Sequence, residues 1–150
     1  MIPSTVERVS LNTAQHVNAC IREEMEARVA RIAAAGRPAI EERLEELDHE
    51  WDIERVLEAN AATLTASTAA LALTLDRRFA IVPLVVGAFL LQHAVQGWCP
   101  PLPILRRLGY RTQSEIDHER YSLKSLRGDF RNLSTGETTK PKQHVDATRR

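Results

Sequence analysis

A cysteine in a proline-rich turn is the side chain with the clearest chemical potential in this sequence. Cys99 precedes Pro100 and Pro101, which cannot continue a helix because each proline lacks an N–H donor and restricts its predecessor. The cations Arg106 and Arg107 would favour a reactive thiolate if the chain folds back on the turn. The alternative is a small apolar residue that packs the turn, because cysteine is commonly buried and inert.

Gln92 and His93 form a second polar anomaly, inside a long apolar stretch. An ionisable group within a membrane span tends to face a partner helix or an aqueous path. We expect His93 to bond across to hydroxyl groups of the preceding apolar stretch, on Thr63, Thr65, Ser67 or Thr68, and a proton or anion path is the alternative. His93 and Cys99 alone fall short of a closed metal site, so no metal and no cofactor is predicted.

The charges that surround these residues divide the chain into three blocks. Residues 1–58 carry 13 acidic and 7 basic side chains, residues 59–97 carry only Asp76, Arg77 and Arg78, and residues 98–150 carry 11 basic and 6 acidic side chains. The net charge of zero is therefore the sum of an acidic N-terminal part, a nearly uncharged middle and a basic C-terminal part. The basic end alternates with acidic residues and lacks interleaved aromatics, which argues against nucleic-acid binding.

The uncharged middle has the length of two membrane spans. Residues 59–75 and 79–97 each approach the roughly 17–25 residues that a helix needs to cross a bilayer. We therefore predict a transmembrane hairpin, with a buried hairpin of a soluble bundle as the alternative. Small residues recur every four positions in the first span, and this ridge favours close helix approach and a homodimer: Ala62, Ala66 and Ala70.

The basic residues near the span ends predict an orientation. Arg55 precedes the first span and three arginines follow the second, against two in the connecting turn, so both termini are expected in the cytoplasm. The residues after the second span are also expected to contact anionic lipid headgroups: Arg106, Arg107 and Arg111.

Amphipathic helices are predicted on both sides of the spans. Apolar residues recur at helical spacing from residue 4 to 35, and a second helix begins at Pro38, runs on past Trp51 into the first span and pairs with the first helix as a hairpin. The glutamates of the second helix are expected on a solvated face rather than in a metal or partner site. Ser114 is expected to cap a short helix that ends at Gly128. These assignments give an acidic hairpin over residues 1–55, a membrane hairpin over 56–112, a short basic helix over 113–128 and a disordered tail over 129–150.

The turn after the second span carries a motif of seven residues: Gly97, Trp98, Cys99, Pro100, Leu108, Gly109 and Thr112. It resembles the YgaP-like transmembrane domain family, a bacterial inner-membrane hairpin with cytoplasmic ends that often forms dimers. The resemblance covers residues 56–112, and this chain departs from the family pattern in its second proline, Pro101, and in additional residues before Leu108. In that family the cysteine of the turn is a proposed site of thiol modification or sulfur handling.

Three functions are compatible with this sequence. The first is an anchor or assembly module in a bacterial inner membrane, without enzymatic activity, whose partners are the bilayer and a second copy of the chain. The second is a membrane module that handles sulfur or small anions through the thiol of Cys99. The third is a soluble helical bundle that binds other proteins. The chain contains no Walker loop, dinucleotide fingerprint, nucleophile elbow or zinc-protease helix.

Overall fold

The computed structural model describes residues 4–131, and every regular element in this part of the chain is helical. The predicted all-α class is therefore confirmed. In chain order the elements are α1 (Arg8–Leu11), α2 (Gln15–Ala35), α3 (Arg37–His49), α4 (Ile53–Thr74), the 3-10 helix η1 (Arg77–Ala80), α5 (Ile81–Gln96), α6 (Leu102–Arg107) and α7 (Gln113–Arg127).

These elements form two compact units, and each unit draws on separate parts of the sequence. Unit 1 comprises the residues up to Glu24 together with Trp51–Ile116, and unit 2 comprises Met25–Glu50 together with the residues from Asp117 onward. The division therefore does not follow the boundaries expected at residues 55 and 112. Unit 1 has a buried apolar cluster around which Trp98 and Leu105 pack: Val9, Ile53, Leu57, Cys99 and Leu102.

The single helix predicted for residues 4–35 is wrong, because the chain leaves the helix at Asn12 and Thr13. The side-chain amide of Asn12 donates to the Arg8 carbonyl at 2.8 Å, and the Thr13 hydroxyl donates to the Val9 carbonyl at 2.8 Å. Side chains that bond local backbone groups in this way compete with continuation of a helix. The segment is therefore divided into α1 and α2.

The start of α3 agrees with the sequence, but its continuation does not. Gly36 has a φ of 94°, and Pro38 lies in the first turn of α3, where a missing N–H costs least. The chain then breaks before α4, because the Asp52 carboxylate accepts from the Arg55 N–H at 2.7 Å and caps a new helix. Trp51 lies in the break, with the Arg55 guanidinium 4.5 Å from its ring centroid.

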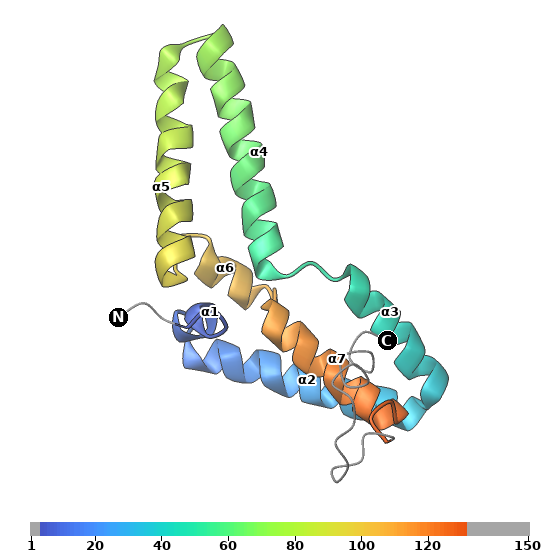
Figure 1. The fold of residues 1–150 in the computed structure, drawn as a ribbon. Coiled ribbons are helices and arrows are strands. Elements are labelled where there is room, and N and C mark those ends of the chain that lie inside the picture. The colour runs from blue at the N-terminus through green and yellow to red at the C-terminus, as the bar shows by residue number, and fades with distance from the viewer. Residues whose placement is uncertain (1–3, 132–150) are drawn as a thin grey trace, which may run out of the picture. The chain divides into compact units, whose positions relative to one another are not determined.

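Helices α4 and α5 lie side by side in unit 1, joined through η1 (Figure 1). We call these two helices the α4–α5 pair. Asp76 caps η1 by accepting from the Arg78 N–H at 2.8 Å, and Pro83 lies in the first turn of α5, as the sequence predicts. The three charged residues of the connection, Asp76, Arg77 and Arg78, are exposed at one end of the pair.

The motif turn begins at Gly97, which ends α5 in a left-handed conformation with φ of 76°. The helix does not continue through Pro100 and Pro101, as the sequence predicts, and a short new helix, α6, begins after Pro101. Its prolines lie at the helix start, where the orphan N–H groups need no partner within the helix. At Gly97 a Cβ atom would stand 2.5 Å from the Arg8 carbonyl oxygen, so α1 packs directly on the glycine.

Replacing Gly97 by alanine is expected to destabilise the protein by about 2 kcal/mol or more, from the left-handed backbone and the clash with α1. Gly87→Ala is the matched control, because Gly87 lies inside α5 with no atom within 4 Å of an added Cβ. That change should be neutral or stabilise by up to about 1 kcal/mol. Thermal unfolding of the two variants measures the difference, and equal midpoints would contradict the packing described for Gly97.

Helix α7 is capped by Thr112 rather than by the expected Ser114. The Glu115 N–H donates to the Thr112 hydroxyl at 3.3 Å, and the Thr112 N–H donates to the Glu115 carboxylate at 2.8 Å. This reciprocal pair is a capping box, which satisfies two orphan donors at once. Helix α7 ends at Arg127, close to the predicted stop at Gly128, and residues 132–150 of the predicted tail lie outside the described residues.

Candidate functional site

A partly buried polar cluster lies where α1 meets the α4–α5 pair, and its buried member is His93. The Nε2 atom of His93 lies 2.8 Å from the Glu54 carboxylate, which also accepts from the Arg8 guanidinium at 3.0 Å. Arg8 reaches α5 as well, donating to the Ala94 carbonyl at 3.1 Å. A cation that bonds the last carbonyls of a helix satisfies orphan acceptors and complements the helix dipole.

The partners predicted for His93 across the pair are wrong. The hydroxyls of Thr63 and Thr68 instead donate to carbonyls of their own helix, at 2.7 and 2.6 Å. His93 turns to Glu54 at the start of α4, and its side chain is only 4% exposed. Its other ring nitrogen, Nδ1, is buried without a hydrogen-bond partner among the described residues. A buried nitrogen without a hydrogen-bond partner is energetically costly, and such groups in folded proteins often have a functional role.

Cys99 lies beside His93, next to a cavity of about 450 Å³. The thiol is buried, and both residues line the cavity wall. The rest of the wall comes from α4, α5 and the motif turn, and apart from Asn60 it is apolar: Leu57, Ala61, Leu64, Val86, Phe89, Leu90, Pro100, Pro101 and Leu105. The volume lies within the range of about 300–1,000 Å³ that is typical of small-molecule sites.

The second cysteine has different surroundings. Cys20 is exposed on α2, and its thiol donates to the Glu24 carboxylate at 3.5 Å. This hydrogen bond, together with the charges of Glu24 and Glu23, raises the pKa of the Cys20 thiol. Cys20 is therefore held protonated and is the natural internal control for Cys99.

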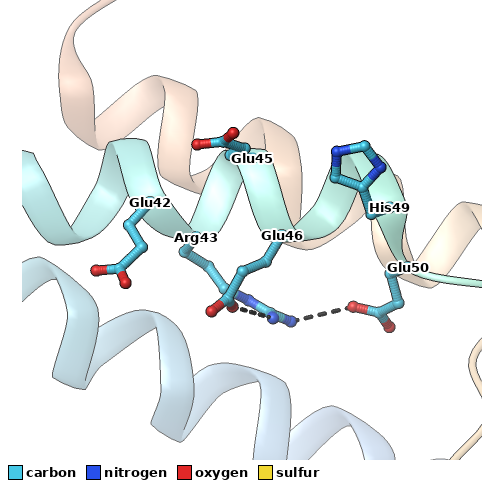
Figure 2. A pocket seen from close by; sticks show the side chains of 6 residues that line it. All are labelled: Glu42, Arg43, Glu45, Glu46, His49 and Glu50. Atoms are coloured by element: carbon cyan, nitrogen blue, oxygen red, sulfur yellow. Dashed lines mark hydrogen bonds and ion pairs between the residues drawn. The ribbon is translucent and has the colours of Figure 1, made fainter.

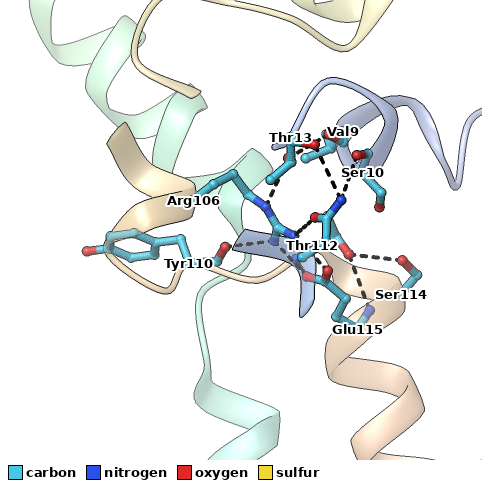
Figure 3. Close-up of polar contacts among 9 residues, drawn as sticks. Val9, Ser10, Thr13, Arg106, Tyr110, Thr112, Ser114 and Glu115 are labelled. Atoms are coloured by element: carbon cyan, nitrogen blue, oxygen red, sulfur yellow. Dashed lines mark hydrogen bonds and ion pairs between the residues drawn. The ribbon is translucent and has the colours of Figure 1, made fainter. Parts of the chain in front are cut away.

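All N–H groups of the Arg106 guanidinium, in unit 1, have acceptors (Figure 3). It binds the Glu115 carboxylate through two parallel hydrogen bonds of 2.7 Å. The remaining donors reach the Thr13 hydroxyl at 3.2 Å, the Tyr110 carbonyl at 3.0 Å and the Asn18 amide oxygen at 2.9 Å. Arg106 thereby joins α6 to α7 and to the beginning of α2.

The prediction of headgroup contact is therefore wrong for two of its three arginines. Arg106 and Arg111 are buried, and the Arg111 carbonyl accepts from the Ile53 N–H at 2.8 Å in the core of unit 1. Arg107 is exposed and keeps that role as a prediction. Arg106 is bonded to Glu115, so the basic side chain beside Cys99 is His93 rather than the expected arginine.

Burial by itself would raise the pKa of Glu115, but the hydrogen bonds from Arg106 and Thr112 outweigh it and lower that pKa below its ordinary value of 4.5. The salt bridge therefore stabilises the fold fully above pH 4.5, and this contribution is lost as the pH falls through the lowered pKa.

We expect the stability difference between the wild type and Glu115→Gln to be largest at neutral pH and to narrow below pH 4.5. The wild-type carboxyl becomes protonated as the pH falls through its lowered pKa, and it then resembles the neutral glutamine. Thermal melts from pH 7 to pH 3 measure this difference. A difference that stays constant over the whole range would contradict the assigned role of Glu115.

The acidic residues of α3 line a shallow surface groove in unit 2 (Figure 2). Glu42, Glu45 and Glu46 are exposed, as the sequence predicts. Arg43 donates to the Glu46 carboxylate at 2.8 Å and to that of Glu50 at 3.2 Å, so part of the negative charge is neutralised within the helix. No group of three or more histidine, cysteine, aspartate or glutamate side chains in the described residues is arranged to hold a metal ion.

Arg43 also forms a salt bridge in the interior of unit 2. It donates at 2.9 Å to Glu119, a fully buried carboxylate that accepts from Arg28 at 3.1 Å as well. A buried carboxylate with two guanidinium partners is a structural pairing that needs no ligand to explain it. The acidic groove therefore carries no site of its own.

The small residues of the predicted ridge, Ala62, Ala66 and Ala70, are exposed on α4 and do not face α5 as buried positions. Three further motif residues do not line the cavity: Trp98 packs on the buried cluster of unit 1, Leu108 follows the last residue of α6, and Gly109 comes next with a φ of 90°. No family model, curated protein or solved structure matches this chain, and the resemblance to the YgaP-like family remains a prediction.

Proposed function

We propose that this protein is an integral membrane protein whose α4–α5 pair crosses the bilayer and anchors the helices that flank it. The observation that carries this proposal is the exposure of large apolar side chains on both helices. Leu84 is 69% exposed, Leu91 is 67% exposed and Leu73 is 88% exposed. Further exposed apolar residues lie on the same two helices: Leu64, Ile81, Val85, Phe89, Leu90 and Val95. Contiguous apolar surface of this kind is expected to face lipid or a partner.

Length and polar pairing support the same proposal. Two helical segments are long and apolar enough to cross a membrane: one contains α4, and the other, Arg77–Gln96, joins η1 and α5. The 22 residues of α4 span about 33 Å at a rise of 1.5 Å per residue. The polar groups of α4 bond within the helix, since Asn60, Thr63, Thr68 and Thr74 each donate to a carbonyl four residues earlier. Such pairing removes donors that would otherwise be costly in hydrocarbon.

The charge distribution supports an orientation with both termini on the cytoplasmic side of a bacterial inner membrane. Arg77 and Arg78 are confined to the connection at one end of the α4–α5 pair, and Glu54, Arg55 and the flanking helices are joined to the other end. The exposed ridge Ala62, Ala66 and Ala70 is available for a second copy of the chain, and we propose that the module is a homodimer through this ridge. No enzymatic step is needed for this anchor role.

Carbonate extraction of membranes from expressing cells tests the proposal. A two-span protein is expected to stay in the alkaline pellet together with a known integral protein, whereas a peripheral protein is released. Recovery in the soluble fraction, as a monodisperse species without detergent, would contradict the anchor proposal. That result would support the soluble bundle, with the apolar face of the α4–α5 pair covered by other chains.

A further inference from the structure

We propose that Cys99 accepts an acyl group from a long-chain acyl thioester whose chain occupies the cavity between α4 and α5. The inference builds on the proposed membrane insertion, because a cavity between two spans is open to the acyl chains of the bilayer. It adds to the anchor role a defined covalent modification site and a substrate class.

The first argument is the order of the polar groups that begins at Cys99 and His93 on the cavity wall. Cys99 lies beside His93, His93 bonds the Glu54 carboxylate through Nε2 at 2.8 Å, and Glu54 is held by Arg8 at 3.0 Å. A nucleophile, a base and a group that orients the base make up the arrangement that activates thiols and hydroxyls for acyl transfer. With Nε2 directed at a carboxylate, the proton of a neutral imidazole stays on Nε2 and leaves Nδ1 as an acceptor.

The second argument is that Nδ1 of His93 has no hydrogen-bond partner among the described residues, although the side chain is only 6% exposed and lines the cavity. Buried polar atoms in folded proteins are almost always paired, and unpaired ones often mark a reactive role. A proton acceptor left open beside a buried thiol is suited to take the thiol proton.

The third argument is the chemistry of the cavity wall. Beyond the polar end, the wall is formed by aliphatic and aromatic side chains of the α4–α5 pair, such as Leu64, Phe89 and Leu90. These apolar side chains would make favourable contacts with an alkyl chain. No lysine or arginine among the described residues lines the cavity, so its wall offers no permanent cation for an anion. A molecule with a reactive carbonyl and a long apolar tail fits both ends of the cavity.

The reaction is an exchange of thioesters. The Cys99 sulfur attacks the carbonyl carbon of the acyl thioester, a new carbon–sulfur bond forms, and the bond to the departing thiol breaks. His93 takes the proton of the Cys99 thiol and returns it to the departing thiolate. Atoms and charge balance without an oxidant or a reductant.

The test uses the full chain, purified from membranes in detergent, and an alkyne-tagged palmitoyl thioester of coenzyme A. The wild type and Cys20→Ser are expected to acquire a label that hydroxylamine removes, and Cys99→Ser is expected to lose at least nine-tenths of it. Equal labelling of Cys99→Ser and the wild type would overturn the proposal, as would equally fast labelling of the heat-unfolded wild type.

Two further variants separate a specific site from a merely accessible thiol. His93→Gln is expected to slow labelling at least tenfold, which is less than the rate enhancement that a general base typically provides. Circular dichroism checks that this variant keeps its helical content. Leu64→Trp narrows the cavity and should slow labelling by the palmitoyl thioester while sparing the acetyl thioester. If His93→Gln does not fold, the chain-length result decides, and equal effects on both thioesters would overturn the proposal.

Carbonate extraction of the same preparations separates the two proposals. Labelling of Cys99 in a protein that alkali releases would contradict membrane insertion and leave acyl transfer supported. A protein that resists extraction but acquires no label at Cys99 would leave the anchor role intact and overturn the acyl-acceptor inference.

Discussion

Replacing Arg106 by alanine is expected to destabilise the protein by about 3–5 kcal/mol, the range typical for removing one partner of a buried ion pair. Arg106 is only 1% exposed, and it provides five hydrogen bonds to groups of α2, of α7 and of the segments that precede these two helices. Its loss leaves the Glu115 carboxylate without its main partner and opens a gap between helices. The capping box at Thr112 shares the same carboxylate, so the start of α7 is weakened as well.

Arg107→Ala is the matched control, because Arg107 is the next residue and is exposed. Its effect should stay within about 0.5 kcal/mol. Arg106→Lys keeps the charge but cannot form the two parallel bonds to Glu115, so it should recover only part of the stability. Thermal or denaturant unfolding of the three variants measures this order, and equal stability of Arg106→Ala and Arg107→Ala would contradict the described network.

The double variant Leu84→Lys, Leu91→Lys is expected to lose stable membrane insertion. Placing a lysine at the centre of a spanning helix costs about 3 kcal/mol relative to leucine, and these two side chains are among the most exposed on α5. In a soluble protein the same surface changes would be close to neutral or would improve solubility. The fraction of the variant in the carbonate pellet therefore distinguishes the two environments.

Leu126→Lys provides the control for added charge, since Leu126 is half exposed on α7, outside the α4–α5 pair. It should leave the pellet fraction unchanged. If the double variant also remains in the pellet and keeps its thermal stability, the exposed leucines of α5 do not face lipid.

Much of the fold could be predicted because local signals dominate it. Gly36 and Pro38 mark the junction of two helices, and Pro83 and Gly97 mark the two ends of α5. The predicted helix boundaries are wrong where a side chain forms a hydrogen bond with a nearby backbone group. Asp52 accepts from the Arg55 N–H and interrupts a helix whose composition suggested continuity. Whether such a hydrogen bond forms depends on the side-chain rotamer and on local backbone geometry, which the periodicity of apolar residues does not determine.

The candidate site could be predicted only in part. Cys99 and His93 stand out because a thiol in a proline turn and an imidazole in an apolar helix are unusual. Their partners could not be found this way, since Glu54 is 39 residues from His93 and Arg8 is 46 residues from Glu54. The position of Arg106 after the second span predicts a contact with lipid headgroups. Its actual partner, the Glu115 carboxylate, lies one helix further along the chain.

Photolabelling from within the bilayer tests membrane insertion most directly. The protein is reconstituted into vesicles that contain a phospholipid with a photoreactive group near the end of one acyl chain, and the labelled peptides are identified by mass spectrometry. We predict that the label concentrates on residues 59–75 and 79–96, above all at exposed positions such as Leu84 and Leu91, and spares α3 and α7. Labelling that is absent from these two segments, or equal on α7, would contradict a membrane-spanning α4–α5 pair.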